Sequence, residues 1–519
     1  MDSSMRGGCL KTVEVFEIQV EEPVLGQPNF DTQRVIKALS LHLPQKVSQN
    51  LKFSLKTLRK LPHILRKNKG KVWLVCVLKE NYHELIDIFE KPPENVKGVA
   101  IDLGSTTIAF YIYDFLKNKN IKEFSISNPQ IEIGEDILTR LHFARKEEKL
   151  KYIQEITLRA INQELAKFKG VYYISICGNT TMTHFLLGLP VNYLFVEPYV
   201  PCANWIGIFD AEEIGLKTEK GAGVFVFPNA GTYFGGDLIA GLFYSEIHKK
   251  EELNFFIDVG TNAEVVLGNK DFLLACAGAA GPALEGGIFE CGSRAKEGAI
   301  EKVIINPEKK EVKFFTIGNT PPTGICGSGI IELIAEMFLK GLLTPEGKFN
   351  PPAFPERFHK INDEFVFIVV PPEKTANGKS IYIKESEVKS FIRSKGAMFS
   401  ILSLVCEKVG ITFKDVAHFF VAGSFGNHIN VESAVILGML PEEALKKIVP
   451  LGNSAGKGAL KFLLQPDLKE IRNIMENITY IELNIEPRFM ELLTGALFIP
   501  HVNREMFPWV MQKLKNLQK

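Results

Sequence analysis

The sequence predicts an α/β protein with two similar lobes and a small α/β domain in front of them. Two observations support this fold class. Apolar segments with strand periodicity alternate with amphipathic segments of helical periodicity through most of the chain. In addition, one strand–turn–strand motif occurs twice, at 99–106 and 255–262. The 519 residues are 46% hydrophobic and 23% charged, an ordinary globular composition for a chain of about three domains.

The domain boundaries follow from changes in the pattern of predicted strands, helices and linkers along the chain. The segment Val13–Val20 alternates like a strand, and Asp31–Leu43 has the pattern of a helix. Lys91–Asn95 contains two prolines and is interpreted as a linker. We expect a disordered N-terminus at 1–10, a small α/β domain at 11–95, a core at 96–500 with lobes at about 96–250 and 251–500, and a C-terminal helix or tail at 501–519.

The charge balance excludes several classes of protein. The chain has 61 Lys and Arg against 60 Asp and Glu, which argues against a nucleic-acid or membrane-surface partner. The N-terminus lacks an apolar signal-peptide core, so a cytoplasmic protein is expected. Lys46–Lys79 holds ten Lys and Arg and no acidic residue. A solvated basic helix face is the favoured interpretation of this segment, and a docking patch for an acidic partner is the alternative.

The eight cysteines are scattered. No two are closer than fifteen positions, and no CxxC occurs, so the sequence offers no local zinc or iron–sulfur motif. We predict reduced, buried thiols and no iron–sulfur cluster in this chain. A cluster assembled from distant cysteines, or shared across a homodimer, stays an open alternative.

The repeated motif has the chemistry of a phosphate site. Glycine lets the backbone turn and approach a ligand, and successive backbone N–H groups with Ser or Thr hydroxyls can face phosphate oxygens. Asp102 and Asp258 are expected to hold Mg²⁺ through water, and the two hairpins to clamp one ATP triphosphate from opposite sides of a cleft. One such turn alone is common, but two copies with matching flanks favour a site. Neither copy is a P-loop. The predicted binding residues are Asp102, Gly104, Ser105, Thr106, Thr107, Asp258, Gly260, Thr261 and Asn262.

These hairpins resemble the two phosphate motifs of the acetate and sugar kinase/Hsp70/actin (ASKHA) superfamily. The segment Val421–Asn427 is similar to its glycine-rich adenosine motif. The resemblance implies a two-lobed ATPase core built from a duplicated ribonuclease H-like unit. It also implies nucleotide contacts from Gly423, Ser424, Phe425 and Gly426.

A more specific resemblance is to the reductive activators of corrinoid proteins. It rests on an ordered series across 97–500: Asn128–Gln130, Gly134–Asp136 with Arg140, Gly178–Met182, Gly235–Asp237, Ala279–Gly286, Gly324–Gly329, Gly452–Gly456 and Ile481–Leu483. The series implies ATP-dependent reduction of Co(II) to Co(I) in a corrinoid iron–sulfur or corrinoid methyltransferase partner. It adds Gly327, Ser328 and Gly329 to the predicted binding residues. Residues 11–95 resemble, more weakly, the middle region that precedes this core.

One feature of that family is not matched. Its members usually carry an iron–sulfur ferredoxin domain at one end of the chain, and these 519 residues contain no such cysteine pattern. The expectation is therefore a separate ferredoxin-type electron donor.

Hydrolysis of ATP requires an aligned water, and two carboxylates are candidates for positioning it. Asp237 follows two glycines and opens an apolar helix at Leu238–Ile247, where a plain N-cap is an equally good interpretation. Asp136 lies four residues before Arg140, and its alternative is a surface ion pair with that arginine.

Three other functions remain open at this stage. A small-molecule kinase on the same fold would also use Asp237 as a base. A nucleotide switch or scaffold would bind a corrinoid partner without a redox role. A dehydratase activator of the same superfamily would hold an iron–sulfur cluster between two subunits.

Overall fold

The structure is a computed structural model, and it describes residues 10–26, 30–260, 263–278, 287–361, 363–423 and 429–517. The chain forms two compact units. The first contains residues up to Tyr244 together with Ser454–Glu476, and the second contains Ser245–Asn453 and Asn477–Lys519. Within the described ranges, no helix combines the length and apolar character needed to cross a membrane.

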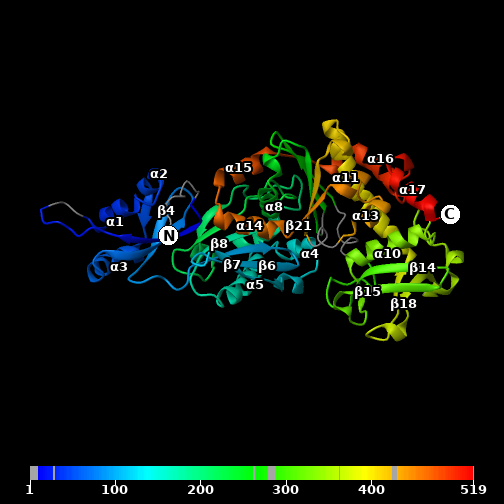
Figure 1. Cartoon of the computed structure of the whole chain (residues 1–519), viewed down its shortest axis with the longest axis horizontal. Helices are drawn as coiled ribbons and strands as arrows, with labels where there is room; N and C mark the ends of the chain where they lie inside the picture. Colours follow the sequence, from blue (N-terminus) through cyan, green and yellow to red (C-terminus); the bar gives the residue numbers. More distant parts are fainter. Residues whose placement is uncertain are drawn as a thin grey trace. The chain divides into compact units, whose positions relative to one another are not determined.

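The first unit begins with a small α/β domain (Figure 1). Four strands form a mixed sheet in the order β1-β3-β4-β2, and most apolar side chains of the central strand β3 are buried. Its elements are β1 (Val13–Gln19), α1 (Asp31–Leu39), α2 (Gln45–Gln49), β2 (Leu51–Phe53), α3 (Leu55–Lys67), β3 (Lys71–Leu78) and β4 (His83–Phe89).

The basic segment of this domain is largely neutralised by its own carboxylates. Lys56 and Lys60 on α3 contact Asp87 at 2.5 and 2.9 Å. Lys67, at the end of the same helix, lies 2.9 Å from Glu90. Such partly exposed pairs add little stability, but they leave less net charge for an acidic partner. The contacts favour the interpretation of a solvated basic face.

A six-stranded sheet in the order β7-β6-β5-β8-β10-β9 forms the core of the first unit. Strand β5 is antiparallel to β6 and parallel to β8, which is in turn parallel to β10. The carboxyl ends of these three parallel strands therefore lie at one edge of the sheet. The strands are β5 (Lys97–Leu103), β6 (Thr107–Asp114), β7 (Lys119–Ser127), β8 (Val171–Gly178), β9 (Gly207–Asp210) and β10 (Gly223–Val226).

Helices cover both faces of this sheet. Alternate residues of β5, such as Val99 and Ile101, join a core cluster with Ile153 and Ile161 of α5. Because side chains alternate along a strand, the intervening residues face the other side, where α14 contacts β5 and β8. The helices of this unit are α4 (Ile137–Phe143), α5 (Glu147–Leu165), α6 (Thr180–Leu187), α7 (Ala211–Ile214), α8 (Gly236–Ser245), α14 (Ser454–Leu464) and α15 (Leu468–Asn477).

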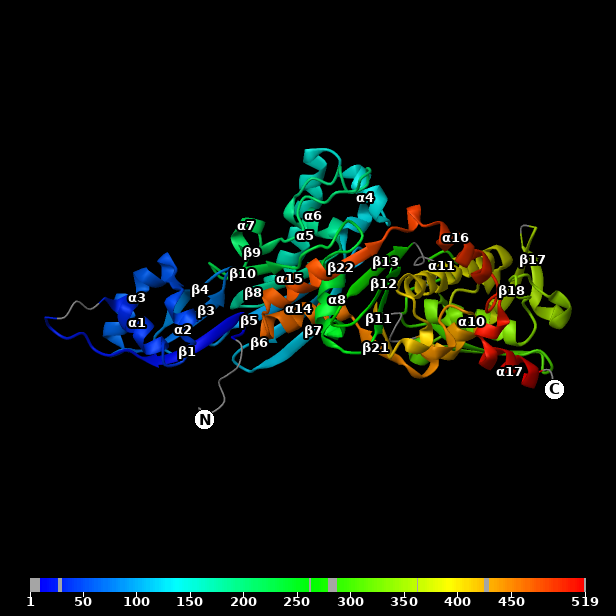
Figure 2. The same cartoon turned by 90° about the horizontal axis from the view of Figure 1, so that it is seen from above.

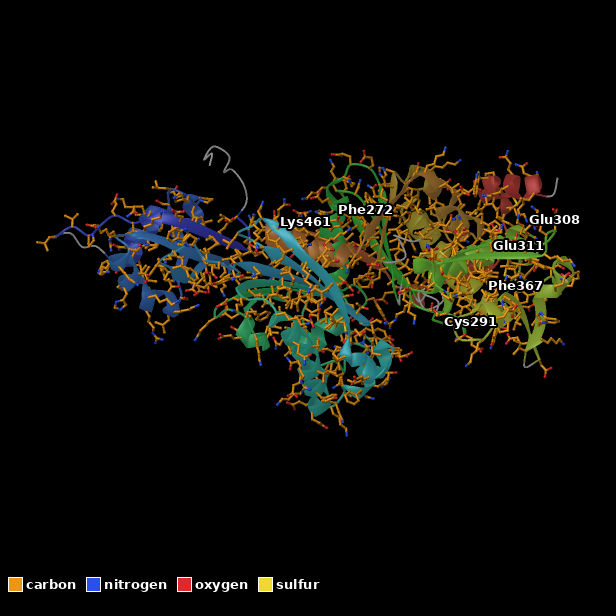
Figure 3. All side chains as sticks on the ribbon, turned by 60° about the horizontal axis from the view of Figure 1, so that its bottom comes forward. Phe272, Cys291, Glu308, Glu311, Phe367 and Lys461 are labelled. Carbon is orange, nitrogen blue, oxygen red and sulfur yellow. The ribbon has the colours of Figure 1, made fainter. Side chains whose placement is uncertain are left out.

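The helix α14 lies in the first unit, although the sequence analysis placed residues 454–476 in the second lobe. Two glycines explain its close packing. A Cβ at Gly456 would lie 2.4 Å from the Tyr111 ring, and one at Gly458 would lie 2.0 Å from Ala240 O. Lys461, labelled in Figure 3, donates from Nζ to Phe243 O at 2.7 Å. The two glycines indicate that α14 packs closely against a neighbour, but their spacing in the sequence does not show which lobe contains that neighbour.

The second unit contains another six-stranded sheet, in the order β21-β20-β11-β12-β13-β22 (Figure 2). Strand β11 is antiparallel to β12 and parallel to β20, and β20 is parallel to β21. The strands are β11 (Asn254–Val259), β12 (Ala263–Gly268), β13 (Leu273–Gly278), β20 (His418–Ala422), β21 (Ile448–Gly452) and β22 (Ile478–Ile481).

The rest of the second unit adds two small sheets and further helices to one large apolar core. The sheets have the orders β15-β14-β16 and β17-β18-β19. Their strands are β14 (Ala299–Asn306), β15 (Glu311–Thr316), β16 (Gly324–Ile325), β17 (Phe358–Ile361), β18 (Glu364–Val370) and β19 (Ile381–Lys384). The helices are α10 (Gly327–Leu339), α11 (Glu385–Val409), α13 (Val431–Ile436), α16 (Pro487–Ala496) and α17 (Pro508–Leu517).

Candidate functional site

The first predicted phosphate hairpin joins β5 to β6. Leu103 pairs with Ile108, so residues 104–107 form the turn. Gly104 is required by packing, because a Cβ there would lie 2.7 Å from Thr107 O. Ser105 is half-buried and Thr107 is exposed, so backbone and hydroxyl groups of the turn are accessible to a ligand.

Two buried polar side chains hold this turn in place. Asn128 donates from Nδ2 to Gly104 O at 2.8 Å, and its backbone N–H donates to Thr106 O at 2.9 Å. Arg140 donates from Nη1 to Ser105 O at 2.5 Å. Three successive carbonyl oxygens of the turn, those of Gly104, Ser105 and Thr106, therefore accept hydrogen bonds from Asn128 and Arg140.

Arg140 is completely buried and is surrounded by oxygen acceptors. Its Nε and Nη2 donate to Gly134 O (2.7 Å) and Glu135 O (3.2 Å). The Gln130 side chain lies 3.5 Å from Nη1. Burial lowers the pKa of Arg140, yet an arginine stays protonated, so a fixed positive charge lies behind the turn. The sequence analysis quoted Asn128, Gln130 and Arg140 only as part of a resemblance and missed this role.

Asp136 has a structural explanation. It is the N-cap of α4, where Oδ1 accepts from Thr139 N at 2.8 Å and Oδ2 from Thr139 Oγ1 at 2.6 Å. These bonds lower the pKa of Asp136, whose side chain is exposed. The expected alternative, an ion pair with Arg140, is absent from the contacts of the described residues. A carboxylate that already accepts two local hydrogen bonds is a weak candidate base, so Asp136 is better explained as a helix cap.

Asp102 and Asp237 belong to one electrostatic neighbourhood. Asp102 lies on β5 directly opposite Cys177 of β8. Burial, followed by the negative charges of Asp102 and Asp237, raises the pKa of the Cys177 thiol. Both carboxylates are therefore near the carboxyl end of β8.

Asp237 lies in the first turn of α8 and is not its N-cap. The helix begins at Gly236, one residue before Asp237 and two before the predicted start at Leu238. A Cβ at Gly235 would lie 2.4 Å from Asn179 Cα. Asp237 Oδ1 accepts from Leu238 N at 2.9 Å. Burial raises the pKa of Asp237 to about 6, which suits a general base near neutral pH.

The second predicted hairpin joins β11 to β12 in the second unit. Val259 pairs with Ala263, which makes this turn one residue shorter than the first. Asp258 lies opposite Ala422 at the end of β20. Gly423 follows with φ of 79°, and a Cβ there would lie 3.2 Å from Asp258 Oδ1. The structure thus places Gly423, from the predicted adenosine motif, beside Asp258 of the second phosphate motif. Thr261, Asn262, Ser424, Phe425 and Gly426 lie outside the described residues, as do Ala279–Gly286.

Gly327, Ser328 and Gly329 form the first turn of α10. Ser328 Oγ lies 3.2 Å from Cys326 Sγ, and a Cβ at Gly329 would lie 2.1 Å from Ile300 O. Close packing of α10 on β14 therefore explains at least Gly329.

The aspartate at the end of each hairpin strand can be compared with the ligands that Mg²⁺ takes beside nucleotide phosphates. Among the described residues, no group of three or more His, Cys, Asp or Glu side chains is arranged to hold a metal. Mg²⁺ that accompanies a nucleotide is usually held by one or two carboxylates, phosphate oxygens and waters. In the first unit Asp102, and in the second unit Asp258, lies at the end of a strand beside a glycine turn, so each aspartate by itself has the chemistry of one such carboxylate ligand.

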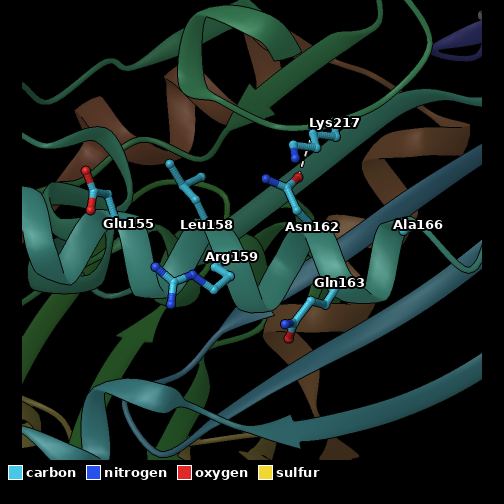
Figure 4. A pocket seen from close by; sticks show the side chains of 7 residues that line it. All are labelled: Glu155, Leu158, Arg159, Asn162, Gln163, Ala166 and Lys217. Carbon is cyan, nitrogen blue, oxygen red and sulfur yellow. Dashed lines mark hydrogen bonds between the residues drawn. The ribbon is translucent and has the colours of Figure 1, made fainter.

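A pocket on α5 does not belong to this site. Figure 4 shows a pocket along α5 that is lined by residues such as Glu155 and Arg159, and within it Lys217 N donates to Asn162 Oδ1 at 2.8 Å. It includes no residue from the carboxyl ends of β5 or β8. The seven cysteines in the described ranges are free thiols. Five of them are buried, Cys202 is exposed and Cys291 (Figure 3) is half-buried.

Comparison with known families decides the relationship. A model of the C-terminal domain of RACo, described as its ASKHA domain, matches residues 252–511. Models of the RACo middle region and linker region match 97–250 and 10–95. The chain belongs to the RACo family. The predicted ASKHA fold and the resemblance to reductive corrinoid activators are thereby confirmed. One assignment was wrong: residues 11–95, which were compared with the RACo middle region, match its linker region. The middle region matches the first lobe instead.

Curated relatives agree with this assignment. The chain is 30% identical over 491 residues to the corrinoid activation enzyme RamQ of Eubacterium limosum, which covers 88% of this chain and 82% of that protein. It is 25% identical over 418 residues to the [Co(II) methylated amine-specific corrinoid protein] reductase of Methanosarcina barkeri, with 74% and 73% coverage.

A solved structure shares the fold over nearly the whole chain. The reductive activator for corrinoid, iron-sulfur protein superposes with a TM-score of 0.87 and 31% sequence identity, covering 98% of this chain and 82% of the other. The RACo-type architecture is therefore common to the N-terminal domain and both units.

Proposed function

We propose that this RACo-family protein is an ATP hydrolase that reductively activates a corrinoid protein from Co(II) to Co(I). The observation that carries the proposal is the pair of Asp–x–Gly hairpins, one at the edge of each core sheet, in a chain related to activators named for corrinoid proteins. The partner is proposed to be a corrinoid iron–sulfur or corrinoid methyltransferase protein. The electron is proposed to come from a separate ferredoxin-type donor.

In this proposal, each hairpin binds phosphate oxygens of ATP. In the first, the N–H groups of 104–107 and the Ser105 hydroxyl face the ligand, while Asn128 and Arg140 keep the turn fixed. The Arg140 guanidinium donates to a carbonyl oxygen of the turn, and its positive charge favours an anion bound to that turn. Asp102 and Asp258 would hold Mg²⁺, which would neutralise phosphate charge as the terminal phosphate leaves.

Asp237 is the proposed general base. Its carboxylate lies in the first turn of α8, near the carboxyl ends of the parallel strands where Asp102 also lies. Its raised pKa lets it accept a proton from water and release it again near neutral pH. A kinase would use the same carboxylate on a substrate hydroxyl, so the acceptor has to be determined by experiment.

ATP turnover is proposed to supply the free energy for an uphill electron transfer. Each ~59 mV of unfavourable one-electron potential corresponds to about 1.4 kcal/mol. A nucleotide can help only if it binds two states of the protein with different affinity. Linkage then requires that the corrinoid partner and ATP change each other's affinity by the same factor.

A titration tests the proposal. A Co(II) corrinoid protein is titrated into the enzyme with ADP, with a non-hydrolysable ATP analogue and without nucleotide, and ATP turnover is measured in parallel. We expect affinity to differ at least about fivefold between nucleotide states, the lower end of typical coupling. Equal affinity in all three states would remove the coupling. A phosphorylated small molecule as product would instead identify a kinase.

A further inference from the structure

One fully buried asparagine in the first unit has no partner for its side chain. Asn229 is 0% exposed, and within the described part of the chain neither Oδ1 nor Nδ2 contacts a donor or an acceptor. Its backbone N–H donates to Asn204 O at 2.9 Å, which fixes the segment. Leaving a buried amide unpaired costs about 1–3 kcal/mol. Such a group in a native fold therefore indicates a ligand or an ordered water.

The chain around Asn229 forms a narrow loop that returns to the start of α8. Ala230 N donates to Phe234 O at 2.8 Å, which closes the loop at one level. At the other level, a Cβ at Gly236 would lie 2.8 Å from Phe227 Cβ. Asn229 lies between these two contacts. It therefore lies across the loop from the residue that precedes the helix.

That residue, Gly235, connects the loop to the candidate site. A Cβ at Gly235 would lie 2.4 Å from Asn179 Cα, immediately after the end of β8. Asn229 is thus placed where the carboxyl ends of β8 and β10 meet the first turn of α8. This turn carries Asp237, and the same edge of the sheet carries Asp102.

We propose that the Asn229 amide positions the attacking water of ATP hydrolysis beside the Asp237 carboxylate, an inference that rests on the proposed ATPase function. An amide suits this task because it offers both a donor and an acceptor. Oδ1 accepts one water O–H, the second O–H is left for Asp237, and a water lone pair then faces the phosphorus. We would expect an asparagine with a purely structural role to form hydrogen bonds from Oδ1 and Nδ2 to other protein groups.

The step is a balanced hydrolysis. The water oxygen forms a bond to the γ-phosphorus, and the bond from that phosphorus to the β,γ-bridging oxygen breaks. ADP leaves with the electron pair, and the water proton passes to Asp237 and then to solvent. Asn229 neither gains nor loses a proton. It orients the water for the chemical step, so we expect its replacement to change kcat.

The test replaces Asn229 with an apolar side chain of similar size. Asn229→Leu should lower kcat about 100-fold, comparable to removing one donor at an oxyanion site. The KM for ATP should stay within about threefold, because the amide does not bind the phosphates in this proposal. The melting temperature should stay the same or rise, since the variant no longer buries unpaired polar atoms.

A matched control is available in the second unit. Asn254 is also 0% exposed, but its Nδ2 donates to Glu252 O at 2.6 Å and its Oδ1 lies 3.3 Å from His418 Nδ1. Asn254→Leu should lower the melting temperature and leave kcat per folded molecule unchanged. The two buried asparagines thus predict opposite patterns of stability and turnover.

The outcomes separate this inference from the proposed function. If the wild type does not hydrolyse ATP, the proposed function fails. If the wild type hydrolyses ATP and Asn229→Leu keeps its kcat, the inference alone fails. A raised KM with unchanged kcat would overturn it by making Asn229 a substrate-binding residue. If the Leu variant does not fold, Asn229→Ala is measured instead, and wild-type kcat in that variant overturns the proposal equally.

Discussion

The two core sheets repeat one five-stranded plan and then differ at their margins. In the first unit the shared order is β7-β6-β5-β8-β10, and in the second it is β13-β12-β11-β20-β21, with the same strand directions. The sixth strand is added on opposite sides. Strand β9 is antiparallel to β10, whereas β22 is parallel to β13. The conserved part of the plan is therefore the part that presents an Asp–x–Gly hairpin at a strand end.

The two hairpins are supported in different ways. The first has a turn of four residues, held from behind by Asn128 and Arg140. The second has a turn of three residues and lies beside Gly423, whose left-handed backbone leaves room for Asp258. The duplication thus places an aspartate at the equivalent position of each sheet, whereas different neighbouring residues support each hairpin.

The largest expected effect tests whether the two hairpins are equivalent in function. Asp102→Ala and Asp258→Ala should each reduce Mg²⁺-dependent ATP turnover at least about 1000-fold, because each removes a carboxylate from the metal site. Circular dichroism should show an unchanged fold. Normal turnover in one of the two variants would mean that only the other hairpin binds the nucleotide.

The next effect concerns a residue that has no counterpart in the repeated motif. Asp237→Asn should lower kcat about 100- to 1000-fold as a lost general base. In the wild type the base must be deprotonated, so kcat/KM should rise with pH through about 6, the raised pKa of Asp237. The variant should lose this rise. A pH profile that is the same in both proteins would exclude Asp237 as the base.

A third prediction addresses the support of the first hairpin. Arg140→Met should cost about 2 kcal/mol of folding stability, because it leaves buried carbonyl oxygens such as Ser105 O unpaired. Denaturant unfolding measures this cost, and calorimetry should show weaker nucleotide binding. Arg159→Met, at an exposed position of α5, is the control and should change neither quantity. Equal effects of the two variants would contradict a supporting role for Arg140.

The smallest effect compares the turn glycines themselves. Gly104→Ala places a Cβ 2.7 Å from Thr107 O and should cost about 1–2 kcal/mol of stability. Gly260→Ala meets no described atom within 4 Å, so its change should stay within about 0.5 kcal/mol. Thermal unfolding of both variants measures the difference. Similar losses would show that the two turns are equally tight.

The chain by itself determined the duplicated hairpins, because their strands and turns are encoded by residues that are close in sequence. Asp102 and Asp258 could be chosen from that repeat, and the RACo-type resemblance followed from short ordered segments. Local periodicity also predicted strand β1 within about one residue of its observed end.

Tertiary structure alone decided how distant side chains are used. The packing of α14 on the first sheet depends on Gly456 and Gly458 meeting residues hundreds of positions away, and no local pattern encodes that. The same holds for Arg140, because the sequence does not show that this side chain donates to the Ser105 carbonyl oxygen. Asn229 could be singled out only because the folded structure buries its side chain and shows no hydrogen-bond partner for it among the described residues. Hydrogen bonds and close contacts between distant segments are properties of the packed chain, so only the folded structure reveals them.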